Sequence, residues 1–353
     1  MTLKKATLVC KKDSSIFQGI SFGYEGNTAG EVVFTTGMVG YPQTLTDPSY
    51  EGQILVMTYP IIGSYGVPDM SLWESERIHT KAVIVSDYID TPSHYQSIKT
   101  LGAWLKEQKV IGLQIKDTRF LTQYLRDNGS QLGKIIFSGD TPWYDPNKDN
   151  LVQRVSPKKI VTYDSPSPKK KHTILLIDCG MKKNMLRCLT KRGVTVIVVP
   201  WDFDPFEKKI KFDGLIISNG PGDPKMAKKT ISIIKKALGE KIPTLGVCLG
   251  NQLLALAAGG DTYKLKFGHR GQNQPCFLEG TKKCYITTQN HGFAVGKIPP
   301  GFKAWFINAN DKTNEGIIHL TLPFMSTQFH PEANPGPTDT EWIFDFFLNR
   351  IKT

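Results

Sequence analysis

Residues 242–260, IPTLGVCLGNQLLALAAGG, place a cysteine between an expected strand and an expected helix. The apolar run at 242–247 is typical of a buried strand, and the run after residue 251 is typical of a helix. Between them, Gly246-Val247-Cys248-Leu249-Gly250 has the G-x-C-x-G spacing of a nucleophile elbow, with sulfur in place of the serine oxygen. Glycine at both positions allows a sharp turn and close packing of the strand on the helix. The stretch therefore predicts an α/β fold in which the Cys248 sulfur stands above a sheet.

Strand-like and helix-like runs alternate around this elbow. HTILLIDCG, VTVIVVP and GLIISNGPG are strand-like, whereas MKKNMLRCLTKRG and TISIIKKALGE are helix-like. Such alternation indicates a parallel sheet with helices on both faces. Further strand-like runs, KCYITTQ, KAWFINA and PFMSTQFH, precede a final amphipathic helix, EWIFDFFLNRI. We expect an open, mostly parallel sheet with helices on both faces.

The first half of the chain has a different pattern. Runs rich in β-formers, punctuated by glycine and proline, cover most of residues 6–60, and KAVIVSDYI at 81–89 adds another strand. A second helix is expected near 120–126, ending at Asn128-Gly129. An earlier helix is indicated by four apolar residues that share one helical face: Ile98, Leu101, Trp104 and Leu105.

A change of composition separates the two halves. The run SPSPKKKH at 165–172 is polar, basic and interrupted by proline, which is typical of a linker because it has little to bury. We therefore predict a mixed α/β N-terminal domain at 1–150, a linker at 151–171 and the sheet domain at 172–353.

A thiolate nucleophile needs a base and a group that orients the base. His330-Pro331-Glu332 supplies both residue types, and residues i and i+2 of an extended segment point the same way. Proline favours extended geometry at the residue before it. The N-terminus of the helix after Cys248 would favour the thiolate. The alternatives are a buried structural cysteine and a strand-end histidine beside a solvated glutamate.

An acyl-transfer site also needs donors for the oxyanion. The N–H of Leu249, directly after the nucleophile, is one candidate. The loop Asn219-Gly220-Pro221-Gly222-Asp223 follows a parallel strand, and ligands of open α/β sheets bind at that end of the strands. The alternative is an ordinary tight turn.

The composition favours a globular protein and argues against a zinc-binding, secreted or membrane protein. The chain of 353 residues is 40% hydrophobic and 22% charged, which is typical of a globular protein. Its six cysteines form no C-x-x-C pair, so we expect no zinc site, and free thiols suit a reducing cytoplasm. No long apolar run follows Lys4 and Lys5, and none is long enough for a membrane span, so we expect neither a secretory signal nor membrane insertion.

The formal charge of +12 has two interpretations. Lysines occur in scattered pairs, such as Lys182-Lys183 and Lys235-Lys236, with few interleaved aromatic residues. This pattern favours a solvated basic surface, facing an acidic partner, over a nucleic-acid site.

Together these motifs resemble those of a class I, triad-type glutamine amidotransferase: G-V-C-L-G, the S-N-G-P-G-D-P run at 218–224 and the F-H-P-E run at 329–332. More specific runs are similar to the carbamoyl phosphate synthetase small chain. They include KLKFGHRG at 264–271, QNHGFAV at 289–295, TGMVGY at 36–41 and LTDPSY at 45–50. The similarity covers nearly the whole chain.

The resemblance implies a role for individual residues. The nucleophile falls on Cys248 and the base on His330, with Glu332 behind it. No metal ligand is implied. The contacts to L-glutamine fall on Ser49, Gly220, Gly222, Leu249, Gln252, Asn290, Gly292 and Phe293. Because Ser49 lies in the first half, both domains would touch the substrate, and the N-terminal domain would also contact a partner.

One residue departs from the family pattern: Asn251 stands where histidine commonly follows C-L-G. Asparagine cannot carry a proton, so this position bears on rate or coupling.

The family resemblance implies a heterodimer. No G-x-x-x-x-G-K-[ST] loop and no acidic Mg²⁺ cluster is recognisable. We therefore expect no cofactor in this chain, and ATP and Mg²⁺ on a separate large synthetase subunit that receives ammonia. A cytoplasmic location is also expected. Further assembly of the heterodimers is left open, as is the choice among arginine biosynthesis, pyrimidine biosynthesis and both. The rival hypotheses are a glutaminase that serves another synthetase and a regulatory subunit without catalysis.

Overall fold

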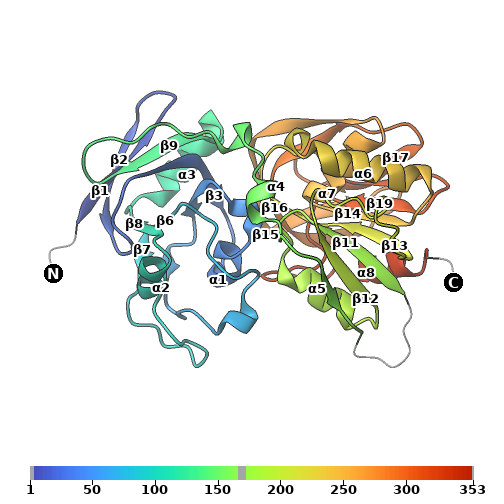
Figure 1. Cartoon of the computed structure of the whole chain (residues 1–353). Helices are drawn as coiled ribbons and strands as arrows, with labels where there is room; N and C mark the ends of the chain where they lie inside the picture. Colours follow the sequence, from blue (N-terminus) through green and yellow to red (C-terminus); the bar gives the residue numbers. More distant parts are fainter. Residues whose placement is uncertain (1–3, 166–171, 352–353) are drawn as a thin grey trace. The chain divides into compact units, whose positions relative to one another are not determined.

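The computed structural model describes residues 4–165 and 172–351, and the chain separates into two compact units (Figure 1). We describe each unit by itself. The first unit comprises Met1–Asp149 and Lys266–Gly271, and the second comprises Asn150–Leu265 and Gln272–Thr353.

A closed seven-stranded barrel forms the centre of the first unit, with strand order β1-β2-β8-β6-β4-β3-β9. Strands β3, β4, β6 and β8 pair in parallel, whereas β1, β2 and β9 are joined by antiparallel pairs. The barrel strands are β1 (Lys5–Cys10), β2 (Ile16–Ser21), β3 (Thr28–Thr35), β4 (Gln53–Met57), β6 (Ala82–Val85), β8 (Ile111–Gln114) and β9 (Gln131–Ile136). The remaining elements are α1 (Tyr41–Leu45), α2 (Leu101–Glu107), α3 (Thr118–Asn128), the short pair β5 (Ile61–Ile62) and β7 (Asp87–Tyr88), and 3₁₀ turns at Pro48–Tyr50, Met70–Leu72 and Pro146–Lys148.

The helices of the first unit begin and end where local signals place them. Thr100 caps α2 by accepting from the N–H of Ala103, and Asp117 caps α3 in the same way. Helix α3 ends at Asn128, and Gly129 follows it with a positive φ, as the Asn-Gly pair predicts. The prediction that Ile98 shares the face of α2 is wrong, because Ile98 precedes the cap and is 60% exposed.

A ten-stranded mixed sheet dominates the second unit, with order β10-β12-β11-β13-β14-β19-β18-β17-β15-β16. Its strands are β10 (Val161–Tyr163), β11 (Thr173–Asp178), β12 (Thr195–Pro200), β13 (Gly214–Ile217), β14 (Thr244–Val247), β15 (Asp261–Leu278), β16 (Cys284–Lys297), β17 (Phe302–Asn308), β18 (Asn314–His319) and β19 (Phe324–Thr327). The helices are α4 (Val152–Val155), α5 (Lys183–Thr190), α6 (Lys228–Gly239), α7 (Leu249–Ala257) and α8 (Trp342–Leu348), with a 3₁₀ turn at Pro224–Met226.

Helices cover both faces of this sheet, as the alternating pattern predicts (Figure 1). Alternate residues of β11 enter different cores: Ile174 and Leu176 pack with α5 and α8, whereas Leu175 and Ile177 pack with α6 and α7. Because both faces of β11 are buried, neither face favours polar side chains, which explains the continuous apolar run in its sequence.

The sheet of the second unit differs from the prediction in two respects. Strands β12, β11, β13, β14 and β19 are parallel, but antiparallel strands extend the sheet beyond β19, and the long strand β15 and the strand β18 were not predicted. Part of the expected linker at 151–171 is ordered as α4 and β10, and β10 pairs antiparallel with β12. Backbone pairing holds β10, whose side chains are exposed. Residues 166–171 of the expected linker lie outside the described residues.

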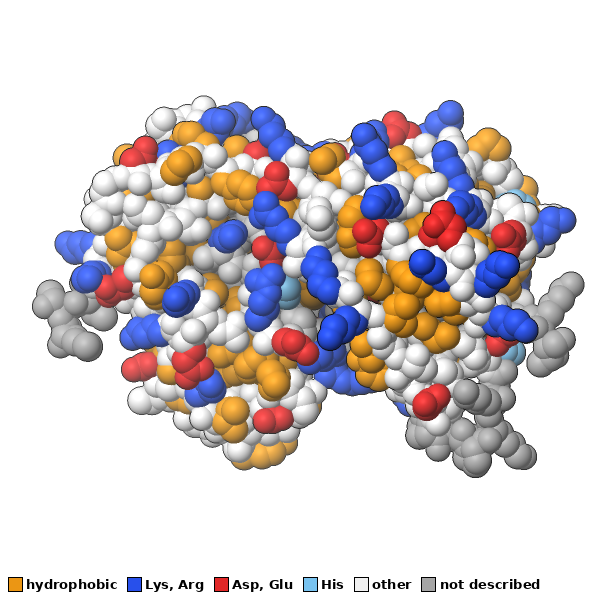
Figure 2. All heavy atoms as spheres, in the orientation of Figure 1, with side chains coloured by type: hydrophobic (Ala, Val, Ile, Leu, Met, Phe, Trp, Pro, Cys, Tyr) orange, Lys and Arg blue, Asp and Glu red, His pale blue; other side chains and the backbone are white. Residues whose placement is uncertain are grey.

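The state of the cysteines and the spread of surface charge agree with the predictions from composition, apart from Lys182, which is described below. All six cysteines are free, and Cys284 is the exposed one. On the face shown in Figure 2, Lys and Arg side chains are spread over both units, with Asp and Glu side chains among them. None of the helices in residues 4–165 and 172–351 combines the length and the hydrophobicity that a membrane crossing requires.

Candidate active site

Cys248 occupies a strained turn between β14 and α7. It is the residue that precedes the first turn of α7, with φ 55° and ψ −103°, a backbone conformation that non-glycine residues rarely adopt. The glycines on either side are required sterically. A Cβ on Gly246 would lie 2.3 Å from the carbonyl oxygen of Gly250, and a Cβ on Gly250 would lie 2.2 Å from that of Ile217. The sequence therefore builds the sharp elbow that the G-x-C-x-G spacing predicts.

The predicted base and its orienting carboxylate meet directly. His330 and Glu332 lie just beyond β19, and the Nδ1 of His330 is 2.6 Å from Oε1 of Glu332. Each residue is 1% exposed. A carboxylate at Nδ1 leaves Nε2 as the ring atom that can exchange a proton with a nucleophile. This Nε2 is buried and has no hydrogen-bond partner within residues 4–165 and 172–351.

The buried pair changes the titration of both groups. Burial acts to lower the pKa of His330, but the charges of Glu332 and Cys248 outweigh it and raise this pKa to about 10. Burial acts to raise the pKa of Glu332, but His330 and then Lys182 more than offset this effect and lower it. The pair therefore favours an imidazolium beside a carboxylate at neutral pH, and the charge of Cys248 adds to this effect.

Lys182 was expected on a solvated basic surface, and that prediction is wrong. Its side chain is buried, its Nζ donates to the carbonyl oxygen of Ala333, and the same Nζ lies 3.8 Å from Oε1 of Glu332. The side chain of Asn184 donates to the carbonyl oxygen of Glu332. A buried cation needs a charged partner. The N-terminus of α5 therefore supplies residues that hold the His330–Glu332 segment.

The loop after β13 packs tightly against the start of α7. A Cβ on Gly220 would lie 2.1 Å from the carbonyl oxygen of Cys179 and 2.9 Å from Leu249 Cδ2, so only glycine fits. Asn219 fixes the loop through a hydrogen bond from its Nδ2 to the carbonyl oxygen of Gly180. As the first residue of α7, Leu249 has an N–H without an acceptor inside the helix. The role of these N–H groups as oxyanion donors stays a prediction.

The predicted glutamine contacts of the second unit come from three elements. Gly220 and Gly222 lie in the loop after β13, Leu249 and Gln252 lie on α7, and the other three lie on β16: Asn290, Gly292 and Phe293.

One hydrogen bond connects these contacts to the elbow, and another connects two of them to each other. The sulfur of Cys248 lies 3.6 Å from the carbonyl oxygen of Asn290. Nε2 of Gln252 donates to the carbonyl oxygen of Phe293 at 2.8 Å. Ser49 belongs to the 3₁₀ turn Pro48–Tyr50 of the first unit, where its N–H donates to Asp47, and its place at the site stays a prediction.

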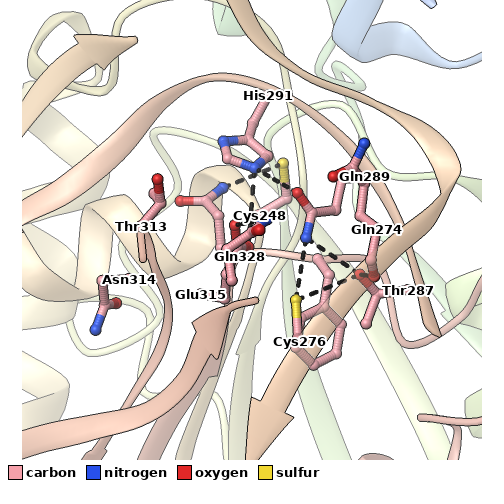
Figure 3. Close-up of polar contacts among 12 residues, drawn as sticks. Cys248, Gln274, Cys276, Thr287, Gln289, His291, Thr313, Asn314, Glu315 and Gln328 are labelled. Carbon is pink, nitrogen blue, oxygen red and sulfur yellow. Dashed lines mark hydrogen bonds and ion pairs between the residues drawn. The ribbon is translucent and has the colours of Figure 1, made fainter. Parts of the chain in front are cut away.

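Asn251 has a defined structural role in the second unit. Its Nδ2 donates to Oε1 of Gln328 at 3.0 Å, and its Oδ1 accepts from the hydroxyl of Ser326 at 2.8 Å. Nε2 of Gln328 lies 3.8 Å from the sulfur of Cys248 (Figure 3). Sequence reasoning flagged Asn251 but missed Gln328, although Gln328 directly precedes the F-H-P-E run.

His291 stabilises the strand that carries three of the predicted contacts. Its Nδ1 lies 2.8 Å from the carbonyl oxygen of Phe293. Its Nε2 lies 3.2 Å from Oε1 of Gln289, as Figure 3 shows. Gln289 in turn donates to Cys276 and Thr287, which fixes its amide. This buried network holds the backbone of β16 near the nucleophile.

Comparison with known proteins agrees with this geometry. Residues 175–350 match the family model described as glutamine amidotransferase class-I, and residues 9–135 match carbamoyl-phosphate synthase small chain, CPSase domain. The arginine-specific small chain of carbamoyl phosphate synthase from Saccharomyces cerevisiae is 45% identical, over 99% of this chain and 89% of that one. This chain belongs to the carbamoyl phosphate synthase small-chain family.

Members of the small-chain family also occur within much longer proteins. A multifunctional protein of Saccharomyces cerevisiae is 47% identical over 97% of this chain, and the multifunctional protein CAD of Squalus acanthias is 50% identical over 95%. This chain spans 17% and 16%, respectively, of the length of those relatives.

Proposed function

We propose that this chain hydrolyses L-glutamine to glutamate and ammonia through a thioester on Cys248, and that the ammonia serves carbamoyl phosphate synthesis on a large synthetase subunit. The observation that carries the proposal is the buried contact of 2.6 Å between His330 and Glu332, in the same unit as a cysteine on a strained elbow. Sequence similarity to small chains of carbamoyl phosphate synthase supports the choice of product.

The first half-reaction forms the thioester. The sulfur of Cys248, with its proton transferred to Nε2 of His330, attacks the side-chain carbonyl carbon of glutamine, and the carbonyl electrons move to oxygen. Backbone N–H groups at Leu249 and at the Gly220 loop stabilise this oxyanion. When the carbon–nitrogen bond breaks, the leaving amide nitrogen takes the proton from His330 and departs as ammonia.

The second half-reaction releases glutamate. Water attacks the thioester carbon and gives a proton to His330, and the carbon–sulfur bond breaks to regenerate the Cys248 thiolate. Glu332 keeps the imidazole in one orientation and stabilises its charged form during both steps. The pKa of His330, raised to about 10, suits the role of proton donor better than that of a base acting alone.

Substrate recognition is expected from polar groups around the elbow. Both N–H groups of the Gln252 amide are used, by Phe293 and by Gln328, so its oxygen is the atom available to the α-amino group of glutamine. Ser49 is expected to add a contact from the first unit. Gly222 and Gly292 are expected to offer backbone groups close to the substrate.

Carbamoyl phosphate synthesis requires ATP, which we expect, with Mg²⁺, on the large subunit and not on this chain. The fused relatives support a functional link between a small-chain segment and further catalytic segments. The product could serve arginine or pyrimidine synthesis, because relatives include an arginine-specific chain and multifunctional proteins.

The test uses the complex with its large subunit. Cys248→Ser should abolish glutamine-dependent carbamoyl phosphate synthesis and leave ammonia-dependent synthesis intact, because an alcohol is a poorer nucleophile than a thiolate here. Cys284→Ser, at the exposed cysteine, is the matched control and should retain both activities. Substantial glutamine-dependent turnover by Cys248→Ser would exclude the proposed mechanism.

A further inference from the structure

The side-chain amide of Gln328 lies between the nucleophile and two residues of α7. Gln328 follows β19, and none of its surface is exposed. Its Nε2 is 3.8 Å from the sulfur of Cys248, and its Oε1 accepts from both Asn251 (3.0 Å) and Gln252 (3.1 Å). Figure 3 shows Gln328 beside the sulfur.

The direction of this amide is fixed by a backbone carbonyl. Nε2 of Gln252 donates to the carbonyl oxygen of Phe293 at 2.8 Å, and a carbonyl can only accept. The nitrogen of Gln252 must therefore face Gln328 as well, and only the oxygen of the Gln328 amide can accept from it. Once Oε1 is held in this way, Nε2 must face the sulfur.

Asn251 reinforces the same orientation. Its Nδ2 is the second donor to Oε1 of Gln328, and the hydroxyl of Ser326 donates to its Oδ1. If the Asn251 amide were reversed, two oxygens would face each other across 3.0 Å. Asn251, Ser326 and Gln328 are fully buried, so no bulk solvent could compensate such a mismatch.

We propose that Gln328 is a positioning residue that holds the Cys248 sulfur by donating an amide hydrogen to it, and that Gln252 and Asn251 fix the direction of this amide. As a thiol, Cys248 can donate to the carbonyl oxygen of Asn290, 3.6 Å away. As a thiolate it is repelled by that carbonyl and attracted by the amide of Gln328. The Gln328 amide therefore favours the charged sulfur, because it hydrogen-bonds to the charged form.

This arrangement gives a physical meaning to asparagine at position 251. Histidine commonly stands at this position in the family. A neutral imidazole carries one N–H, so the donor and acceptor ends of a histidine here would depend on its tautomer. Asn251 always presents a donor to Gln328 and an acceptor to Ser326, at any pH. The consequence for glutamine hydrolysis rests on the proposed function, but the hold on the sulfur does not.

The test measures alkylation of Cys248 by iodoacetamide as a function of pH, without glutamine. The parent carries Cys284→Ser, because Cys284 is the exposed cysteine, and the readout is the mass of tryptic peptide 242–264, in which Cys248 is the only cysteine. Gln328→Met keeps the length of the side chain and removes the donor. We expect alkylation at neutral pH to slow roughly tenfold and the midpoint of the pH profile to rise by about one unit.

Three further variants separate positioning from stability. Gln328→Leu should raise the midpoint like Gln328→Met, and Asn251→Leu should raise it less, because the amide of Gln328 is then held by Gln252 alone. Thr327→Val is the matched control: Thr327 is buried beside Gln328, but its hydroxyl donates to Phe329, so its midpoint should stay at the parent value. A purely structural role would change the melting temperature and leave every midpoint in place.

The possible results are decisive in both directions. If the folded Gln328→Met and Asn251→Leu variants keep the parent midpoint, the inference is overturned; should Gln328→Met fail to fold, Asn251→Leu decides. If the parent hydrolyses no glutamine and the midpoint still shifts in Gln328→Met, the proposed function fails and the inference stands. If the parent hydrolyses glutamine and the midpoint does not move, the inference alone fails.

Discussion

Replacing Glu332 by glutamine tests the electrostatic core of the site with almost no change of shape. The amide oxygen can still accept from Nδ1 of His330, 2.6 Å away in the parent, so the ring orientation is retained. What disappears is the negative charge. Burial still lowers the pKa of His330 in this variant. The charge of Cys248 is then the main effect that raises it.

The expected change is large because both groups are buried. In the parent, the pKa of His330 is raised from its usual 6.5 to about 10. In Glu332→Gln we expect it at or below 6.5, so that the imidazole is mostly neutral at pH 7. A change of that size corresponds to roughly 5 kcal/mol between imidazolium and imidazole, at 1.36 kcal/mol for each pKa unit.

Protonation also links the pair to folding stability, with a sign for each group. The raised pKa of His330 contributes stability that is complete below 6.5 and is lost as the pH rises through about 10. The lowered pKa of Glu332 contributes stability that is present above its usual 4.5 and is lost as the pH falls through its folded value. Both contributions are complete between about pH 4.5 and 6.5, so Glu332→Gln should lose most stability relative to the parent in that window.

Two measurements check this prediction. Imidazole NMR titration, with His330→Asn to assign the signal, should show the His330 pKa falling in Glu332→Gln. Urea unfolding at several pH values should show the stability deficit of the variant shrinking as the pH rises from 6.5 toward 10. An unchanged His330 pKa in Glu332→Gln would refute the electrostatic account of the pair.

Three other predictions follow from the same geometry. Gly250→Ala should disrupt the elbow and abolish Cys248-dependent activity, because the new Cβ would lie 2.2 Å from a carbonyl oxygen, whereas Gly239→Ala, with open space around it, should leave glutaminase rates unchanged. Lys182→Met should raise the pKa of Glu332 and lower the free energy of unfolding by about 1–3 kcal/mol, measured by urea denaturation, because it removes the second of the two cations beside this buried carboxylate and leaves His330 as the other. The isolated chain should hydrolyse glutamine slowly and speed up when the large subunit binds, since misalignment of about 1 Å can cost on the order of 100-fold in rate. Steady-state glutaminase rates of the free chain and of the complex test this, with Asn251→His assayed in parallel. Equal rates for the two would show a preformed site.

Much of the second unit could be predicted because its signals are local. Continuous apolar strands, helices with one apolar face and the G-x-C-x-G turn each depend on a few neighbouring residues, and the structure places them where the sequence indicates. The meeting of His330 and Glu332 was predicted, but from the wrong backbone geometry. Pro331 and Glu332 form a turn, closed by the N–H of Ala333 on the carbonyl oxygen of His330, and this turn rather than an extended segment brings the two side chains together. The prediction failed for β15, whose polar and glycine-containing sequence lacks the apolar run that marked the other strands.

The missing parts depend on contacts between distant segments. Closure of the barrel in the first unit requires the pairing of β1 with β9, which no local pattern specifies. Lys182 looked like a surface lysine because only the fold brings Glu332 to it. The amide chain through Gln328 was invisible for the same reason: its members Asn251 and Gln328 are separated by 77 positions in the sequence.

The most direct test of the account is detection of the acyl-enzyme itself. The chain in complex with its large subunit would be mixed with glutamine, quenched in acid and digested, and the masses of all cysteine peptides would be measured. We predict one glutamyl group on the peptide 242–264, bound to Cys248, and its disappearance in Cys248→Ala. A glutamyl group on another cysteine, or glutamine hydrolysis at the parent rate in Cys248→Ala, would contradict it.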